Sequence, residues 1–193
     1  MHRPGLASRR RPRLTSNVRP QNQDTAYHRP SFRFTKESLM DILYYWKSIE
    51  SDLRSGKIGH IRSDREKLET FKAGYPDFIW IFRTPQGRVR DVELLAKLAW
   101  KDAAAKGFTP TVGQGAIHYD PQYPRSGRFG SSSSQASIDK TSDWMRRHFS
   151  AAVRANCVGA NGQQELRGEA LHELRQIAGT WPMEPLVQSS VAN

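Results

Sequence analysis

The chain has 193 residues, a formal net charge of +11 and a single cysteine, Cys157. One cysteine excludes an intramolecular disulfide and a zinc site built from several thiolates. No stretch approaches the roughly 18 apolar residues that cross a bilayer, and no apolar segment near the start has the form of a secretion signal. We therefore expect a protein of the reducing cytoplasm, with no membrane partner.

The positive charge is concentrated at the start of the chain. Residues 1–30 hold seven arginines and four prolines against one acidic residue, Asp24, and show almost no apolar periodicity. Such a segment buries too little apolar surface to fold, so we predict a disordered basic tail over 1–30. Three interpretations of the tail stay open: non-specific contact with phosphates, an organellar transit peptide, or an extension without a role. One folded domain is expected over 31–182, and a frayed end over 183–193.

The first elements after the tail are predicted to be helical. Apolar residues recur at helical spacing within 35–53, and Gly56 follows them as a stop signal. They are Leu39, Ile42, Leu43, Trp46, Ile49 and Leu53. Residues 63–66 have the Ser-x-x-Glu pattern of a capping box, which predicts a second, short helix that ends at Gly74.

The hydrophobic period then changes to that of strands. Residues 77–84 are β-branched and aromatic on both faces, which is typical of a central strand. The turn residues 85–87 lead to a second apolar segment, 88–100, and the pair predicts a β-hairpin. Because 13 residues are long for one strand, we expect a bulge or bend near 90–91.

The rest of the chain predicts one more strand and two helices. Residues 116–120 have the pattern of a short strand, and 127–134 that of a loop rich in glycine and serine. Helices are predicted over 137–155 and from Gly162 to Gly179. The fold class is therefore α+β: a small, curved, mostly antiparallel sheet or partial β-barrel, packed by about four helices.

The motifs of common enzyme families are absent from the sequence. The chain lacks the glycine spacing of a P-loop or dinucleotide site and the Gly-x-Ser-x-Gly elbow of serine hydrolases. Its six histidines are scattered, and none stands four residues from another on a predicted helix, as a metal site there would require. Cys157 has no neighbouring base to activate it. We therefore expect a binding module without a cofactor.

The nearest catalytic pattern is that of a PD-(D/E)xK nuclease. Pro76 and Asp77 precede the hairpin, and its second strand carries Asp91, Glu93 and Lys97. Two carboxylates would hold Mg²⁺, and the lysine would activate water. Glu93 and Lys97 are four residues apart instead of two, which separates their Cα atoms by about 13 Å on a regular strand. A divergent Mg²⁺-dependent nuclease is the first alternative.

One stretch of the chain resembles a known superfamily. A helix leads into 68–74, a hydrophobic strand follows over 77–82, and after the turn comes the apolar strand 94–100. This order is similar to that of the PUA-like superfamily, especially its EVE and YTH-type branches, in which a helix ends at a Gly-Asp just before a strand of a small barrel. The resemblance covers about residues 32–125. Two residues are inserted between the glycine and the aspartate, and the helical part over 138–180 has no counterpart in the family.

The resemblance implies a non-catalytic pocket that binds nucleic acid through a flipped or modified base. Bases stack on aromatic faces with about 1–3 kcal/mol each, and unpaired or modified bases are extruded most readily. The residues expected at this interface are Trp80, Arg83, Trp100, Tyr119, Tyr123, Arg125 and Arg128, with the two tyrosines in an exposed proline-rich loop and Arg90 as a further phosphate contact. The second alternative is a protein-interaction module, with a protein partner in place of nucleic acid.

Overall fold

The computed structural model describes residues 39–102 and 114–186. All described residues belong to one compact unit. The basic tail predicted over 1–30 and residues 187–193 of the expected frayed end lie outside the described residues. Within the described part, no helix is both long and apolar enough to cross a membrane.

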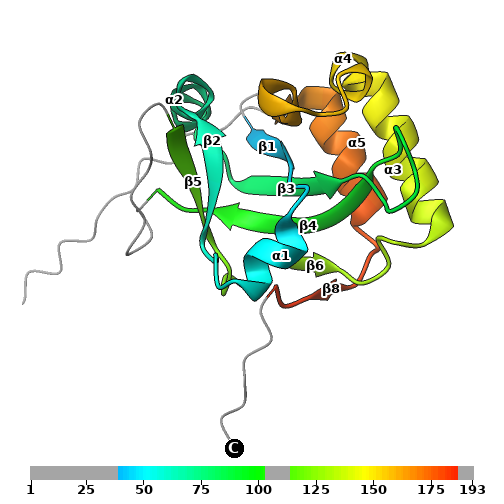
Figure 1. Ribbon diagram of the computed structural model, residues 1–193, viewed down its shortest axis with the longest axis horizontal. Helices are drawn as coiled ribbons and strands as arrows, with labels where there is room; N and C mark the ends of the chain where they lie inside the picture. Colours follow the sequence, from blue (N-terminus) through cyan, green and yellow to red (C-terminus); the bar gives the residue numbers. More distant parts are fainter. Residues whose placement is uncertain (1–38, 103–113, 187–193) are drawn as a thin grey trace, which may run out of the picture. The chain divides into compact units, whose positions relative to one another are not determined.

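The described residues contain eight strands and five α-helices, and four of the strands follow one another in the middle of the chain (Figure 1). The strands are β1 (Met40–Tyr45), β2 (His60–Asp64), β3 (Phe78–Arg83), β4 (Glu93–Trp100), β5 (Gln114–Asp120), β6 (Gly127–Phe129), β7 (Gln163–Arg167) and β8 (Met183–Glu184). The helices are α1 (Ile49–Arg54), α2 (Arg65–Ala73), α3 (Gln135–His148), α4 (Ser150–Arg154) and α5 (Gly168–Ala178), with a 3-10 helix, η1, over Gly159–Gly162. The predicted α+β class is confirmed, with five α-helices in the described residues where about four were expected.

The strands form one mixed sheet in the order β2-β5-β4-β3-β1-β7, and β6 and β8 extend from β4. β1 and β3 are parallel, and the other pairs are antiparallel. The predicted hairpin is formed by β3 and β4, with a register shift between Ile81 and Phe82. Ile81 faces Ala96 and Phe82 faces Leu94, so the extra residue is Leu95 and the bulge lies in the second strand of the hairpin. In the expected place, Arg90 adopts a positive φ of 71° in the turn before β4.

The sheet is curved, as the sequence predicted. β4 pairs with β5 only through Ala99 and Trp100, and with β6 through Ala96 and Lys97. β5 then continues alongside β2, and in Figure 1 these two strands stand upright while β3 and β4 run across the picture. The change of direction bends the sheet around one of its faces.

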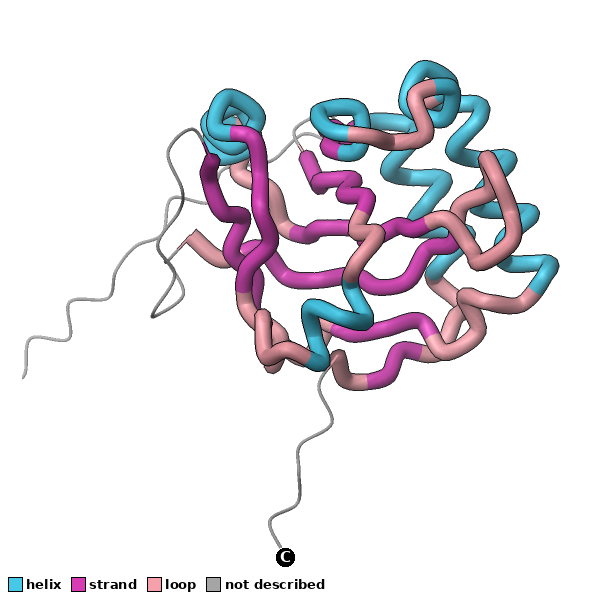
Figure 2. Tube along the Cα trace, viewed as in Figure 1, coloured by secondary structure: helices cyan, strands magenta, loops and turns pink. Residues whose placement is uncertain are grey.

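Both faces of the central strands β1, β3 and β4 are buried. In β3, Ile79 and Ile81 contribute to a first core, which α2 covers at one end. The alternate residues Phe78, Trp80 and Phe82 contribute to a second core. Helices α3 and α5 lie side by side over this second core (Figure 2). Burial on both faces explains why β3 has no alternating polar positions.

The helix predicted over 35–53 is wrong for residues 40–45 and is confirmed only at its end, over residues 49–53. Residues 40–45 form β1, which lies between β3 and β7, and helix α1 begins only at Ile49. Because β1 is buried on both faces, nearly every side chain in it is apolar, and such a run also satisfies helical spacing. Backbone pairing with two neighbouring strands decides between the two structures.

Two other segments form strands where none was expected. Residues 127–129, predicted in a loop, form β6 and pair with β4 and β8. The helix expected from Gly162 begins at Gly168, because 163–167 form the edge strand β7. Only Leu166 of that strand is buried, so its polar sequence carried no strand signal.

The predicted helices of the second half also differ in their ends. The helix expected over 137–155 is divided at Phe149 into α3 and α4. Met183 and Glu184, expected in the frayed end, pair with β6 as β8. The short helix predicted after residue 63 is confirmed as α2, but Asp64 caps it by accepting from the backbone N–H of residues 66 and 67.

Candidate functional site

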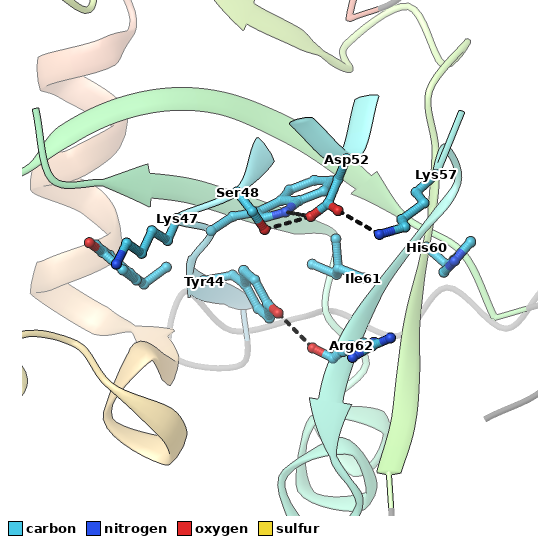
Figure 3. Close-up of a pocket in the computed structure, with 10 residues that line it drawn as sticks. Tyr44, Lys47, Ser48, Asp52, Lys57, His60, Ile61 and Arg62 are labelled. Carbon is cyan, nitrogen blue, oxygen red and sulfur yellow. Dashed lines mark hydrogen bonds and ion pairs between the residues drawn. The ribbon is translucent and has the colours of Figure 1, made fainter. Parts of the chain in front are cut away.

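The first candidate site is a pocket of about 520 Å³ between the end of β1, α1 and β2 (Figure 3). We call it the β1–β2 pocket. It is lined by Tyr44, Tyr45, Trp46, Lys47, Ser48, Asp52, Lys57, His60, Ile61 and Arg62. Tyr44 and Trp46 belong to the first core, so the pocket opens on the face of the sheet that this core covers.

A carboxylate organises one wall of the β1–β2 pocket. Asp52 accepts hydrogen bonds from the indole Nε1 of Trp46 at 2.9 Å and from the hydroxyl of Ser48 at 2.6 Å. The ammonium of Lys57 lies 3.0 Å from its other oxygen. Partial burial raises the pKa of Asp52, but these three donors and the charge of Lys57 outweigh it and lower the pKa to about 2. Asp52 is therefore a fixed negative charge at neutral pH.

Aromatic rings form the floor of the same pocket. Trp46 is 5% exposed and Tyr44 is 9% exposed. The ring of Tyr119 meets Trp46 edge-on, with 6.3 Å between the centroids. The hydroxyl of Tyr44 donates to the backbone oxygen of Arg62 at 2.6 Å, and burial followed by the charge of Asp52 raises its pKa to about 12. The rings are held in place by contacts from three sides.

Basic side chains surround the opening of the β1–β2 pocket. Lys47, Lys57 and Arg62 are exposed, and His60 is half-buried. Figure 3 shows Lys47 on one side of the pocket and Lys57 and Arg62 on the other. The pocket thus combines an apolar aromatic floor with a basic rim, the combination that binds a base and its phosphates.

A second pocket, of about 360 Å³, lies on the side of the second core. We call it the β3–α5 pocket. It is lined by Asp77, Phe78, Trp80, Lys97, Arg125, Phe129, Arg175, Ala178, Gly179, Trp181 and Met183. Trp80 and Phe129 stack at 6.2 Å with an angle of 14° between their rings, and Trp181 meets Phe129 edge-on at 5.7 Å.

Two cationic side chains of the β3–α5 pocket lie over aromatic rings. The ammonium of Lys97 is 4.7 Å from the centroid of Phe78 and 5.5 Å from that of Trp80. The guanidinium of Arg125 lies 5.0 Å from the centroid of Phe78 and 5.7 Å from that of Tyr123. Cation–π contacts of this kind hold both side chains at the pocket without neutralising them.

A buried carboxylate lies beside the β3–α5 pocket. Asp41, 0% exposed, accepts from the indole of Trp80 at 2.8 Å, from the backbone N–H of Phe78 at 3.1 Å and from Arg175 at 3.0 Å. Burial raises the pKa of Asp41, and the bonds from Trp80 and Arg175 oppose that rise. Asp41 thereby fixes both a ring and a cation of the pocket wall.

The structure gathers three of the seven residues predicted for a nucleic-acid interface. Trp80 and Arg125 line the β3–α5 pocket, and Tyr123, 39% exposed, contacts both Phe78 and Arg125. The sequence singled out Lys97 only for the nuclease alternative, although a lysine within the apolar strand 94–100 was a visible signal, and it gave no indication of Arg175.

The other four predicted residues lie elsewhere. Arg83 and Arg128 both pair with Glu50, and Arg83 also pairs with Glu93 at 2.9 Å. Trp100 packs against the first core. The expected exposure of Tyr119 is wrong: it is 1% exposed, because β5 carries it into the first core.

Arg90 lines a third hollow, of about 580 Å³, together with Arg146, Ser150, Val153 and Arg154. Arg146 is ion-paired there with Asp91 and Asp143. No aromatic residue is among the lining residues, so this hollow offers charge without a stacking surface.

The residues of the nuclease alternative are engaged in separate contacts. Asp91 pairs with Arg146, and the buried Glu93 pairs with Arg83 and accepts from Ser132. Asp77 is exposed at the β3–α5 pocket. Across residues 39–102 and 114–186, no group of three or more His, Cys, Asp or Glu side chains is placed to hold a metal ion.

Comparison with protein-family models, curated proteins and solved structures finds no match to this chain. The fold and the two pockets described above are therefore the basis for the function proposed below.

Proposed function

We propose that the chain is a non-catalytic, PUA-like nucleic-acid-binding module that takes a flipped or modified base into the β1–β2 pocket. The observation that carries the proposal is the aromatic floor of Tyr44 and Trp46 beneath a rim of exposed cations. Stacking on such rings contributes about 1–3 kcal/mol per base and tolerates any base. The cations of the rim supply the phosphate contacts that orient the strand.

The fixed polar groups of the pocket supply selectivity. A carboxylate has about four acceptor positions, and Trp46, Ser48 and Lys57 donate to Asp52. The remaining position is free to accept from an exocyclic amino or ring N–H group of a base. Because a low pKa keeps Asp52 ionised, a base that presents a donor is favoured over one that presents an acceptor.

The test is fluorescence anisotropy of the full chain with short single- and double-stranded DNA and RNA, modified and unmodified, over a salt series. Lys47→Gln and Arg62→Gln should each weaken binding several-fold and lower the salt slope by about one. The Arg62 replacement leaves the bond from Tyr44 in place, because that bond goes to a backbone oxygen. Lys140→Gln, at an exposed site on α3, is the matched control for charge.

Three outcomes decide against the proposal. Equal affinity of all three variants would place binding outside the pocket. Cleavage that requires Mg²⁺ and is lost in Asp77→Ala would support the nuclease alternative. Absence of any binding to nucleic acid would direct attention to a protein partner.

A further inference from the structure

We infer that the β3–α5 pocket is a second, independent binding site, for a phosphate monoester carried on a planar ring, such as a nucleotide. The two pockets lie on opposite faces of the sheet: Tyr44 and Trp46 belong to the first core, and Phe78 and Trp80 to the second. This inference does not rest on the proposed function, because no residue lines both pockets.

The cations of the β3–α5 pocket have donors to spare. Lys97 contacts the faces of Phe78 and Trp80, and among the described residues no salt bridge joins it to a carboxylate. Arg125 contacts two rings, and its single hydrogen bond there goes to the hydroxyl of Tyr123 at 3.3 Å. A guanidinium has five N–H donors and an ammonium has three. Most of these donors are therefore available to an anion in the pocket.

The positive charges around the pocket repel one another. Burial, and then the charges of Arg125 and Arg175, lower the pKa of Lys97, while Asp41 opposes the change. Asp41 is already bonded to Arg175 and Trp80 in the interior. A doubly charged anion between Lys97 and Arg125 would relieve this repulsion, and a neutral ligand would not.

One cation is held rigidly, which favours a ligand with several oxygens. Arg175 donates to the buried Asp41 at 3.0 Å, and its side chain is 37% exposed. The guanidinium is thus anchored at one end and open to solvent at the other. An arginine guanidinium can bind a phosphate through two parallel N–H···O hydrogen bonds, which a lysine ammonium does not provide.

The size of the pocket and its rings indicate what carries the phosphate. A volume of about 360 Å³ falls in the range of small-molecule sites and exceeds what a bare inorganic anion fills. Trp181 is half-buried and Tyr123 is 39% exposed, so both retain accessible ring surface near the cations. A planar base would lie against such a ring. The phosphate monoester belongs either to a free nucleotide or to the end of a nucleic-acid strand.

The experiment titrates the full chain with inorganic phosphate, adenosine and AMP by isothermal calorimetry, with the indole N–H signals of Trp80 and Trp181 followed by NMR. AMP should bind more tightly than phosphate and adenosine, and should shift both indole signals. Arg125→Gln, at an exposed position, and Lys97→Gln should each reduce AMP affinity on the order of tenfold. Lys140→Gln on α3 should leave the affinity unchanged, which controls for charge lost elsewhere.

A second pair of probes separates the two sources of the phosphate. Short oligonucleotides with a 5′-phosphate or a 5′-hydroxyl are compared with AMP. If the 5′-phosphate oligonucleotide binds more tightly than both the 5′-hydroxyl form and AMP, and Arg125→Gln removes the difference, the pocket binds strand ends. If AMP binds as tightly as the 5′-phosphate oligonucleotide, the pocket binds free nucleotides. The inference is overturned if AMP affinity is the same in Arg125→Gln, Lys97→Gln and the wild type, or if AMP leaves the signals of Trp80 and Trp181 unmoved. If Lys47→Gln and Arg62→Gln do not weaken nucleic-acid binding at the β1–β2 pocket, the results for AMP at the β3–α5 pocket still stand.

Discussion

The indole of Trp46 donates to the carboxylate of Asp52 across 2.9 Å, and this bond ties the residue that follows β1 to the middle of α1. The same carboxylate oxygen accepts from Ser48. The turn between β1 and α1 is therefore closed on itself by side chains, and the wall of the β1–β2 pocket depends on one ionised group.

Replacing that group should make the protein less stable, and the loss should depend on pH. The pKa of Asp52 is lowered from 3.8 to about 2 in the folded protein, so its stabilising effect is fully present above about pH 4 and is lost as the pH falls to 2. Asp52→Asn should lower the free energy of unfolding by about 1–2 kcal/mol at pH 7. The difference from the wild type should shrink below pH 4 in urea titrations. The exposed Glu169→Gln should show neither effect.

Asp41 should have the opposite pH dependence. Its pKa is raised by burial, so its effect on stability is most favourable in acid and is lost as the pH rises through the folded pKa. Arg175→Met removes a cation that opposes the rise and leaves the buried carboxylate without its charge partner. The free energy of unfolding at pH 7 should fall on the order of 2 kcal/mol, less than for a fully buried pair because Arg175 is partly exposed. A loss that grows toward acid would contradict this account.

The aromatic contact between Phe82 and Trp144 should be a main support of the second core. The two rings stack at 5.6 Å with an angle of 5°, and the indole of Trp144, which is 0% exposed, donates to the backbone oxygen of Ala170 at 3.1 Å. Trp144→Ala should therefore lower the free energy of unfolding by about 3–5 kcal/mol. Val89→Ala, at a residue 81% exposed, should change it little. Denaturant unfolding of both variants at one pH checks the contrast.

Elements with local signals could be predicted from the sequence. Strand β3 combines β-branched and aromatic residues with a following turn, and helix α2 has an acceptor at its start and Gly74 at its end. These signals lie within ten residues of the elements that they specify. The apolar residues Leu68 and Phe71 of helix α2 are both buried.

Elements specified by distant partners could not be predicted. Asp41 and Arg175 are 134 positions apart, and nothing near either residue indicates that they meet. Edge strand β7 is stabilised by pairing with β1, and its own sequence lacks the alternation of apolar and polar residues that would predict a strand. The same reason hid the β1–β2 pocket: a helix through 35–53 would place Trp46 on a helix face, whereas in the structure Trp46 follows β1, belongs to the first core and also lines the pocket.

Gly127 should be required for the wall of the β3–α5 pocket. A Cβ atom on Gly127 would lie 2.4 Å from the backbone oxygen of Glu184 and 3.2 Å from the end of Met183, so β8 would have to move away from β6. Because Met183 lines the pocket, Gly127→Ala should lower the free energy of unfolding by about 1–3 kcal/mol and also weaken binding of AMP.

Gly130 provides a matched control for this substitution. A Cβ atom on Gly130 would approach Glu184 as well, but at the carboxylate end of its side chain, 2.8 Å away, and that end is free to turn aside. Gly130→Ala should therefore leave both the free energy of unfolding and AMP binding close to those of the wild type. If Gly127→Ala is as harmless as Gly130→Ala, contact with β8 is not what positions the pocket wall, and the backbone of β6 tolerates a side chain at Gly127.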